Sequence, residues 1–252
     1  MMKKGLLESC VDSVESALEA AGGGADRLEL CAGLVIGGIT PTPAVYEEIR
    51  KYSDIPVNVL IRPRFGDFCY TDEEFILIKE AVREYRRLGA EGVVIGNLNP
   101  DGTLNMEQMK VLMEEAGDMS VTLHRAFDVC ADPYQTMEQA ISLGIDTILT
   151  SGQKNVCTLG TDLLRDLVEK SAGRIVIQVG SGVNADVISE VYPKTHATAY
   201  HMSGKVTLDS SMVYRKEGVN MGLPSISEYE IWRTDEEAVR KARQVLDRLQ
   251  GE

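Results

Sequence analysis

The chain alternates between short runs of aliphatic and β-branched residues and longer segments in which apolar residues recur every three or four positions. Short apolar runs predict buried strands, and the longer recurrence predicts helices that bury one face. The predicted strands are Gly5–Cys10, Arg27–Cys31, Pro56–Arg62, Gly92–Gly96, Ser120–His124, Thr147–Thr150, Arg174–Val179 and Thr198–His201. The predicted helices are Ser13–Ala21, Pro43–Lys51, Asp72–Leu88, Met106–Ala116, Pro133–Leu143, Leu163–Lys170, Ala185–Val191 and Thr234–Leu249.

Recurring boundary signals support this alternation. The segments Gly24–Leu30, Gly89–Ile95 and Gly144–Thr150 share one form, in which a glycine, a small or apolar residue and an acid precede a predicted strand. Glycine suits the left-handed position that ends a helix. Thr71 and Glu74 have the spacing of a capping box at the start of a helix. The chain therefore reads as a repeated strand–helix unit.

Eight such units in 252 residues predict a (β/α)8 TIM barrel, a fold that takes about 250 residues as a single domain. We therefore expect one TIM-barrel domain over residues 1–252. A long excursion, Gly204–Glu228, follows the eighth strand and precedes the C-terminal helix. A doubly wound open α/β sheet is the alternative, but such a sheet rarely uses eight strands so evenly.

The net charge of the chain limits the kinds of molecule that it is expected to bind. There are 26 Lys and Arg against 39 Asp and Glu, which gives a net charge of −13. Binding to duplex nucleic acid needs a basic face, and docking on anionic lipid needs the same. We therefore expect neither a nucleic acid nor a membrane as partner. A small anionic ligand held by a few arginines remains compatible with this charge.

The cysteines and the apolar runs indicate a cytoplasmic location. The chain has five dispersed cysteines and no CxxC pair, which argues against a disulfide scaffold or a zinc ribbon. No apolar run approaches the roughly 20 residues that span a bilayer. Glu8 and Asp12 follow the first lysines too closely for a signal peptide. We expect reduced thiols in a cytoplasmic protein.

Polar or glycine-rich clusters follow every predicted strand. In a TIM barrel the carboxyl ends of the strands form one rim, and active sites lie there. This places a functional pocket at the rim. The candidate catalytic residues are Glu8, Glu29, Arg62, His124, Arg125, Asp128, Ser151 and His201, and the candidate anion-binding residues are Gly180, Ser181 and Gly182.

Two Glu-x-Cys pairs are the most suggestive of these clusters. Residues two apart on a strand share a face, so Glu8 points the same way as Cys10, and Glu29 the same way as Cys31. If both pairs face inward, two thiols and two carboxylates converge. Two thiolates are soft ligands that suit Cu(I) or Zn(II). A buried cysteine can equally serve as a small apolar residue, so both interpretations stay open.

Positive charge at the rim forms a second candidate feature. Arg62 and Arg125 bring cations into an acidic protein, and together with Gly180–Gly182 they would suit a carboxylate or a phosphate. In an enzyme, His124 or Glu8 would be the general acid or base, and the two arginines would hold substrate charge. Alternatively, the arginines neutralise the rim carboxylates and the glycines serve only a tight turn.

Several of these segments resemble the CutC family of copper-homeostasis proteins. The motifs that carry the resemblance are Cys10–Ala17, Gly23–Cys31, Gly37–Pro41, Ile61–Arg64, Gly66–Phe68, His124–Asp128 and Leu149–Gly152. The resemblance implies a cytoplasmic homodimer with the barrel fold. It also implies copper binding by cysteines, which map onto Cys10 and Cys31.

Two functional hypotheses follow from the residues and the resemblance. One is a copper-binding protein of cytoplasmic copper homeostasis, without turnover. The other is an enzyme, of lyase or isomerase type, that acts on a small anionic or polyhydroxy metabolite at the rim. The chain contains no nicotinamide fingerprint and no P-loop. A passive copper carrier would need two or three soft ligands rather than so many polar rim residues.

Overall fold

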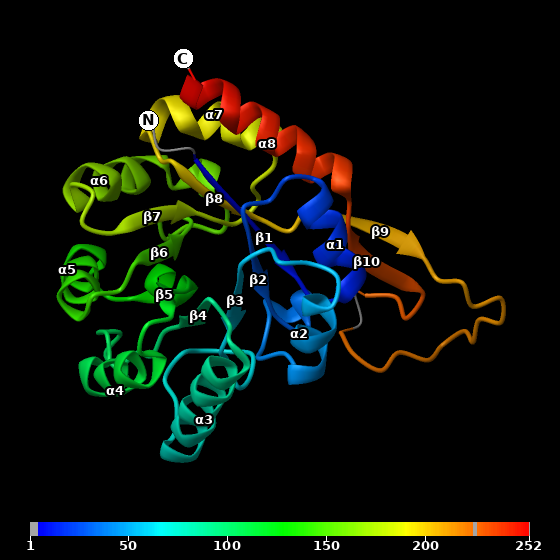
Figure 1. The fold of residues 1–252 in the computed structure, drawn as a ribbon, viewed down its shortest axis with the longest axis horizontal. Helices are drawn as coiled ribbons and strands as arrows, with labels where there is room; N and C mark the ends of the chain where they lie inside the picture. The colour runs from blue at the N-terminus through cyan, green and yellow to red at the C-terminus, as the bar shows by residue number, and fades with distance from the viewer. Residues whose placement is uncertain (1–4, 224–225, 252) are drawn as a thin grey trace.

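Eight parallel strands close into a barrel in the computed structural model, which describes residues 5–223 and 226–251 (Figure 1). Each strand pairs with the next, and β8 pairs back onto β1. This confirms the predicted TIM barrel. The strands are β1 Leu6–Val11, β2 Arg27–Leu30, β3 Val57–Leu60, β4 Gly92–Ile95, β5 Ser120–Leu123, β6 Thr147–Thr150, β7 Val176–Val179 and β8 Ala199–Met202.

Helices surround the barrel, and most begin within a residue of the predicted position, whereas the helix predicted from Leu163 begins at Thr161. Thr71 and Glu74 form the expected capping box, in which the Thr71 hydroxyl accepts the Glu74 N–H at 3.2 Å. The α-helices are α1 Val14–Gly22, α2 Pro43–Arg50, α3 Asp72–Leu88, α4 Met106–Ala116, α5 Pro133–Leu143, α6 Thr161–Ser171, α7 Ala185–Thr195 and α8 Glu236–Gly251. Three short 3₁₀ helices are η1 Leu34–Ile36, η2 Arg125–Val129 and η3 Cys157–Leu159. Within the described parts of the chain, none of these helices combines the length and apolar character of a membrane span.

The two faces of each strand have different roles. Leu28 and Leu30 of β2 belong to the main apolar core, whereas Glu29 and the following Cys31 line a cavity inside the barrel. This is the alternation that period-two side-chain geometry requires. The Glu-x-Cys motif of β2 therefore faces inward, as its spacing predicted.

The excursion after β8 contains a hairpin that the sequence pattern did not reveal. Strands β9 Lys205–Asp209 and β10 Glu230–Thr234 pair in antiparallel fashion and extend away from the barrel (Figure 1). Because Thr234 pairs with Lys205, the last helix starts at Glu236 rather than at Thr234. The pairing also brings Trp232 of β10 to the mouth of the barrel, where it lines the cavity.

Gly92 provides a test of packing in the lower interior of the barrel. The register places Gly92 between Asn58 and Ser120, and a Cβ at this position would overlap the side-chain oxygens of both. Gly92→Ala should lower the free energy of unfolding by about 1–3 kcal/mol, as overpacking does. Urea unfolding measures this change. Gly222→Ala, where an added methyl meets nothing, is the control. Equal stability of the two variants would contradict the packing described.

Candidate functional site

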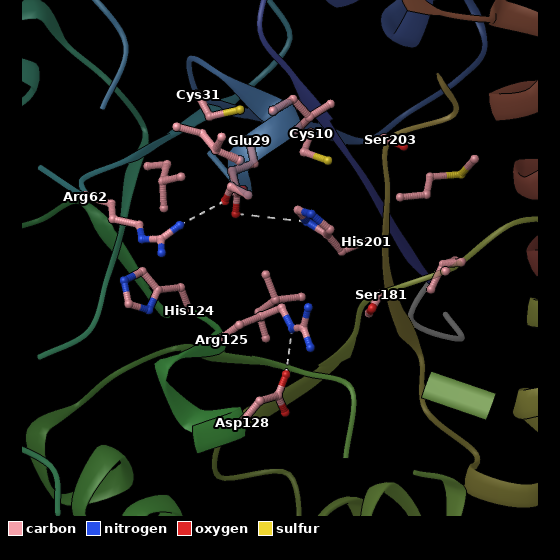
Figure 2. A pocket seen from close by; sticks show the side chains of 18 of the residues that line it. Cys10, Glu29, Cys31, Arg62, His124, Arg125, Asp128, Ser181, His201 and Ser203 are labelled. Carbon is pink, nitrogen blue, oxygen red and sulfur yellow. Dashed lines mark hydrogen bonds and ion pairs between the residues drawn. The ribbon is translucent and has the colours of Figure 1, made fainter. Parts of the chain in front are cut away.

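A cavity of about 710 Å³ opens at the carboxyl ends of the barrel strands (Figure 2). Ten of the residues predicted from the sequence line it, namely Cys10, Glu29, Cys31, Arg62, His124, Arg125, Asp128, Ser181, Gly182 and His201. Three do not line it, namely Glu8, Ser151 and Gly180. The cavity has the size and the mixed apolar and polar lining of a small-molecule site.

Glu8 is fully buried and anchors a charge cluster below the cavity. Its carboxylate accepts hydrogen bonds from Arg27 Nε at 2.5 Å, Gln178 Nε2 at 2.9 Å and His201 Nδ1 at 2.8 Å. Burial alone would raise the pKa of Glu8, but the Arg27 charge and the His201 hydrogen bond outweigh burial and lower the pKa to about 2. Glu8 is therefore an ionised carboxylate at any physiological pH.

His201 joins this cluster to the cavity. Burial opposes its charged form, but the Cys10 sulfur and the Glu29 and Glu8 carboxylates raise the pKa of His201 well above its usual value. Its Nδ1 lies 2.8 Å from Glu8 and 4.0 Å from Glu29. His201 is thus an imidazolium at neutral pH, placed between two acids.

Glu29 is a buried carboxyl group that faces the cavity. Burial raises its pKa to about 7, against the opposing charge of His201 and with the support of the Glu8 charge. Its Oε2 atom has no hydrogen-bond partner among the described residues. Figure 2 shows Arg62 and His201 pointing toward this carboxyl group from opposite sides. Glu29 can therefore exchange a proton near neutral pH.

His124, unlike His201, is a neutral imidazole. Burial, and then the Arg62 charge, lower the pKa of His124 to about 3, so the ring is neutral at physiological pH. Its Nδ1 accepts the Ala126 N–H at 3.2 Å, which assigns the ring proton to Nε2. Nε2 is buried and has no partner within residues 5–223 and 226–251. His124 lines the cavity, and its buried Nε2–H is a donor without a hydrogen-bond partner among the described residues.

Arg62 is held rigidly by backbone carbonyl groups. Its terminal nitrogens donate to Gly38 O at 3.1 Å and to Gly66 O at 2.7 Å. Its guanidinium carbon lies 5.0 Å from the ring centroid of Phe68, a cation–π distance. Since only 8 % of the residue is exposed, Arg62 supplies a fixed positive charge at the cavity wall.

Arg125, Asp128 and Ser151 form a loop support rather than a reactive cluster. Arg125 Nε donates to Asp128 at 2.7 Å, and Asp128 also accepts from the Thr150 hydroxyl at 2.5 Å and from the Ser151 N–H at 3.1 Å. The Ser151 hydroxyl donates to Asp128 at 3.0 Å. Asp128 therefore fixes the loop after β6 and orients Arg125. Gly180 is structural in the same way, because it donates its N–H to Thr150 O at 2.9 Å.

Cys10 and Cys31 are free, buried and on adjacent strands. The register sets Cys10 beside Glu29, and the Cys31 N–H donates to Val11 O at 2.9 Å. Burial, together with the charges at Cys10 and Glu29, raises the pKa of Cys31 far above its usual value. Among the described residues, Glu8, Glu29 and His201 form the cluster whose ligand atoms lie within 4.8 Å of one another. Glu8 and His201, however, already bind each other there.

Several residues of the site escaped the sequence reasoning. Arg27, Gln178, Phe68, Lys205 and Trp232 all contact the charge cluster or line the cavity. Arg27 was visible as a charge at the start of a buried strand. The spacing of residues could not show that this charge meets Glu8, because that pairing depends on the register between two strands.

Comparison with known proteins identifies similar chains. The model of the CutC family matches residues 5–206. A protein of Parabacteroides distasonis named family protein CutC is 43% identical over 94% of this chain and 98% of its own length. The human copper homeostasis protein cutC homolog is 42% identical over 93% of this chain and 86% of its own. A crystal structure of a CutC protein from Streptococcus agalactiae superposes with a TM-score of 0.75 at 29% identity, covering 79% of this chain and 98% of that one.

Loss of the buried Glu8 charge should destabilise the protein far more than loss of an exposed carboxylate. Glu8→Gln leaves Arg27 and His201 buried without their carboxylate, which should cost about 3–5 kcal/mol of unfolding free energy at pH 7. The pKa of His201 should fall at the same time, because a neighbouring negative charge is lost. Urea unfolding and NMR titration of the imidazole measure the two effects. Glu138→Gln, which breaks an exposed pair with Arg174, is the matched control and should change stability little. Similar losses in both variants would contradict this account.

Proposed function

The chain belongs to the CutC family, and we propose that its cavity is the active site of an acid–base enzyme, of lyase or isomerase type, that acts on a small anionic metabolite. The observation that carries this proposal is Glu29, a buried carboxyl group of the cavity lining with a pKa of about 7, whose Oε2 atom accepts no hydrogen bond from the described residues. Groups that transfer protons work best when their pKa lies near the operating pH, and such tuned groups cluster at active sites.

The neighbouring side chains suit the remaining roles. Ionised Glu29 would take a proton from a carbon next to a carbonyl group, and the electron pair of that C–H bond would move onto the carbonyl oxygen. The Nε2–H of His124 would donate to this oxygen as negative charge develops on it. In an isomerase, Glu29 would then return the proton to the former carbonyl carbon, while the hydroxyl group on the first carbon passes its proton to the former carbonyl oxygen and becomes the new carbonyl group. In a lyase, a β-substituent would instead leave with the electron pair as the carbonyl group re-forms.

His124 and Glu8 are less suited than Glu29 to transfer a proton near neutral pH. His124 has a pKa of about 3 and Glu8 has a pKa of about 2, so each keeps one protonation state around neutral pH. Glu8 also lies outside the cavity lining. Glu8 acts instead through His201, whose positive charge favours the ionised form of Glu29.

The interior charge supports an anionic substrate. Arg27, Arg62 and His201 carry three positive charges against the carboxyl groups of Glu8 and Glu29. Because Glu29 is only partly ionised near pH 7, the barrel interior has a net positive charge. An anionic group beside Arg62 would compensate it.

Copper binding is a second candidate function, favoured by the two cysteines on one cavity wall. Cu(I) prefers thiolate ligands and accepts two of them, so the donor set of Cys10 and Cys31 fits this ion as cargo. The name of the human relative refers to copper homeostasis, which supports the same role here. Cys31 must lose a proton on binding, so the affinity should rise with pH.

Glu29→Gln tests the enzyme proposal. The wild type should catalyse exchange of a carbon-bound proton in D2O for at least one member of a panel of anionic hydroxy and keto acids, followed by ¹H NMR. The variant should lose about 10²–10⁴-fold in rate. The rate should rise with pH and level off above about 7, because the ionised carboxyl group is the base. An unchanged rate in the variant, or no exchange across the panel, would contradict the proposal.

A Cu(I) titration of the reduced protein tests the second candidate. The wild type should bind one equivalent in competition with a chromophoric chelator, and the Cys10→Ser/Cys31→Ser double variant should lose that binding. Cys69→Ser/Cys130→Ser alters two cysteines outside the cavity and should bind as the wild type does. Equal, weak binding by all three proteins would rule copper out.

A further inference from the structure

The loop after β7 lines the cavity and contains backbone N–H groups without partners among the described residues. Ser181 and Gly182 line the cavity in left-handed conformations, with φ of 74° and 80°. The Ser181 hydroxyl donates to Asn155 O at 2.6 Å, and the Ser181 carbonyl accepts the Cys157 N–H at 3.1 Å. These two bonds fix the loop against η3. The N–H groups of Ser181 and Gly182 make no hydrogen bond to any described residue.

Two cations line the same cavity. Lys205 is the first residue of β9, and its Nζ lies 3.0 Å from the ring centroid of Trp232. It has no ion-pair partner in the part of the chain that the structure describes. Arg125 lines the cavity with its Nη1 free of hydrogen bonds to those residues.

We infer that this end of the cavity binds a phosphate group, and that the substrate of the proposed enzyme is a phosphate monoester. Two backbone N–H groups without partners among the described residues, on a cavity that Arg125 and Lys205 also line, suit a dianion with three acceptor oxygens better than a carboxylate. The loops after the seventh and eighth strands hold phosphate in many barrels of this type. The inference rests on the proposed function, which supplies the chemistry at the other end of the substrate.

The barrel order sets the shape of this substrate. In a closed barrel of eight strands β3 and β7 lie opposite each other, so Arg62 faces the phosphate end across the cavity. Glu29 on β2 and His124 after β5 lie between them. Two buried atoms there, Arg62 Nε and His124 Nε2, have no partner among the described residues. A short phosphorylated hydroxy or keto compound would place its reacting carbonyl group at this end.

Gly182 offers a matched pair of variants. Asn and Asp both tolerate a left-handed backbone, and an added Cβ would come no closer than 3.4 Å to Val156. Gly182→Asp adds a negative charge at the N–H groups, whereas Gly182→Asn adds a side chain of the same shape without charge. Binding of inorganic phosphate, measured by calorimetry, should weaken at least about tenfold in the Asp variant and stay within about threefold in the Asn variant.

Further variants test whether phosphate binds at this end of the cavity and whether its binding is independent of Glu29. Lys205→Gln should weaken phosphate binding about fivefold or more. Lys170→Gln is the control, because Lys170 lies on α6 over the ring of Tyr134 and does not line the cavity, so its replacement should leave phosphate binding unchanged. Glu29→Gln should keep phosphate binding, so loss of turnover in that variant leaves this inference standing. No phosphate binding by the wild type, or equal binding by the two Gly182 variants, would overturn it. Loss of binding in Arg62→Met alone would also overturn it, because the phosphate would then lie at the other end.

Discussion

The pairing of Glu8 with Arg27 and His201 inside the barrel determines the charge state of the residues around it. A lone carboxylate at this depth would be neutral, because burial strongly disfavours its charge. Arg27 and His201 hold Glu8 ionised, and Glu8 in turn helps to keep His201 protonated. The proton affinity of Glu29 follows from burial and from these two neighbours. Removing one member of the cluster therefore changes the chemistry of a residue that it need not touch.

Inside the barrel, two residues of the same type can differ in protonation and hydrogen bonding because they lie at different depths and have different neighbours. Glu8 and Glu29 have the same side chain on adjacent strands, yet Glu8 accepts hydrogen bonds from three donors while Glu29 Oε2 accepts none from the described residues. His124 and His201 differ in the same manner, since one lies beside Arg62 and the other beside two acids. Residues of the same type thus differ in protonation state and in hydrogen bonding because their neighbours differ.

Much of this arrangement could be predicted from the sequence, because it depends on local periodicity. The alternation of strands and helices led to the barrel, and the spacing of the Glu-x-Cys motif led to the inward face of Glu29 and Cys31. The partner of each charge could not be predicted in this way. The contact of Glu8 with Arg27 depends on strand register, and that of Asp128 with Ser151 on the path of a loop. The β9–β10 hairpin was missed because its two strands lie far apart in the sequence.

The contrast between an acidic exterior and a cationic interior has a kinetic consequence. The chain carries a net charge of −13, so an anion approaching from bulk solvent is repelled at long range and attracted only once it reaches the mouth of the barrel. Mobile ions screen exposed charges much more than buried ones. Added salt should consequently speed the encounter while weakening the final complex only slightly, the reverse of ordinary electrostatic steering. If the substrate is the anion proposed above, it enters such a barrel slowly at low ionic strength.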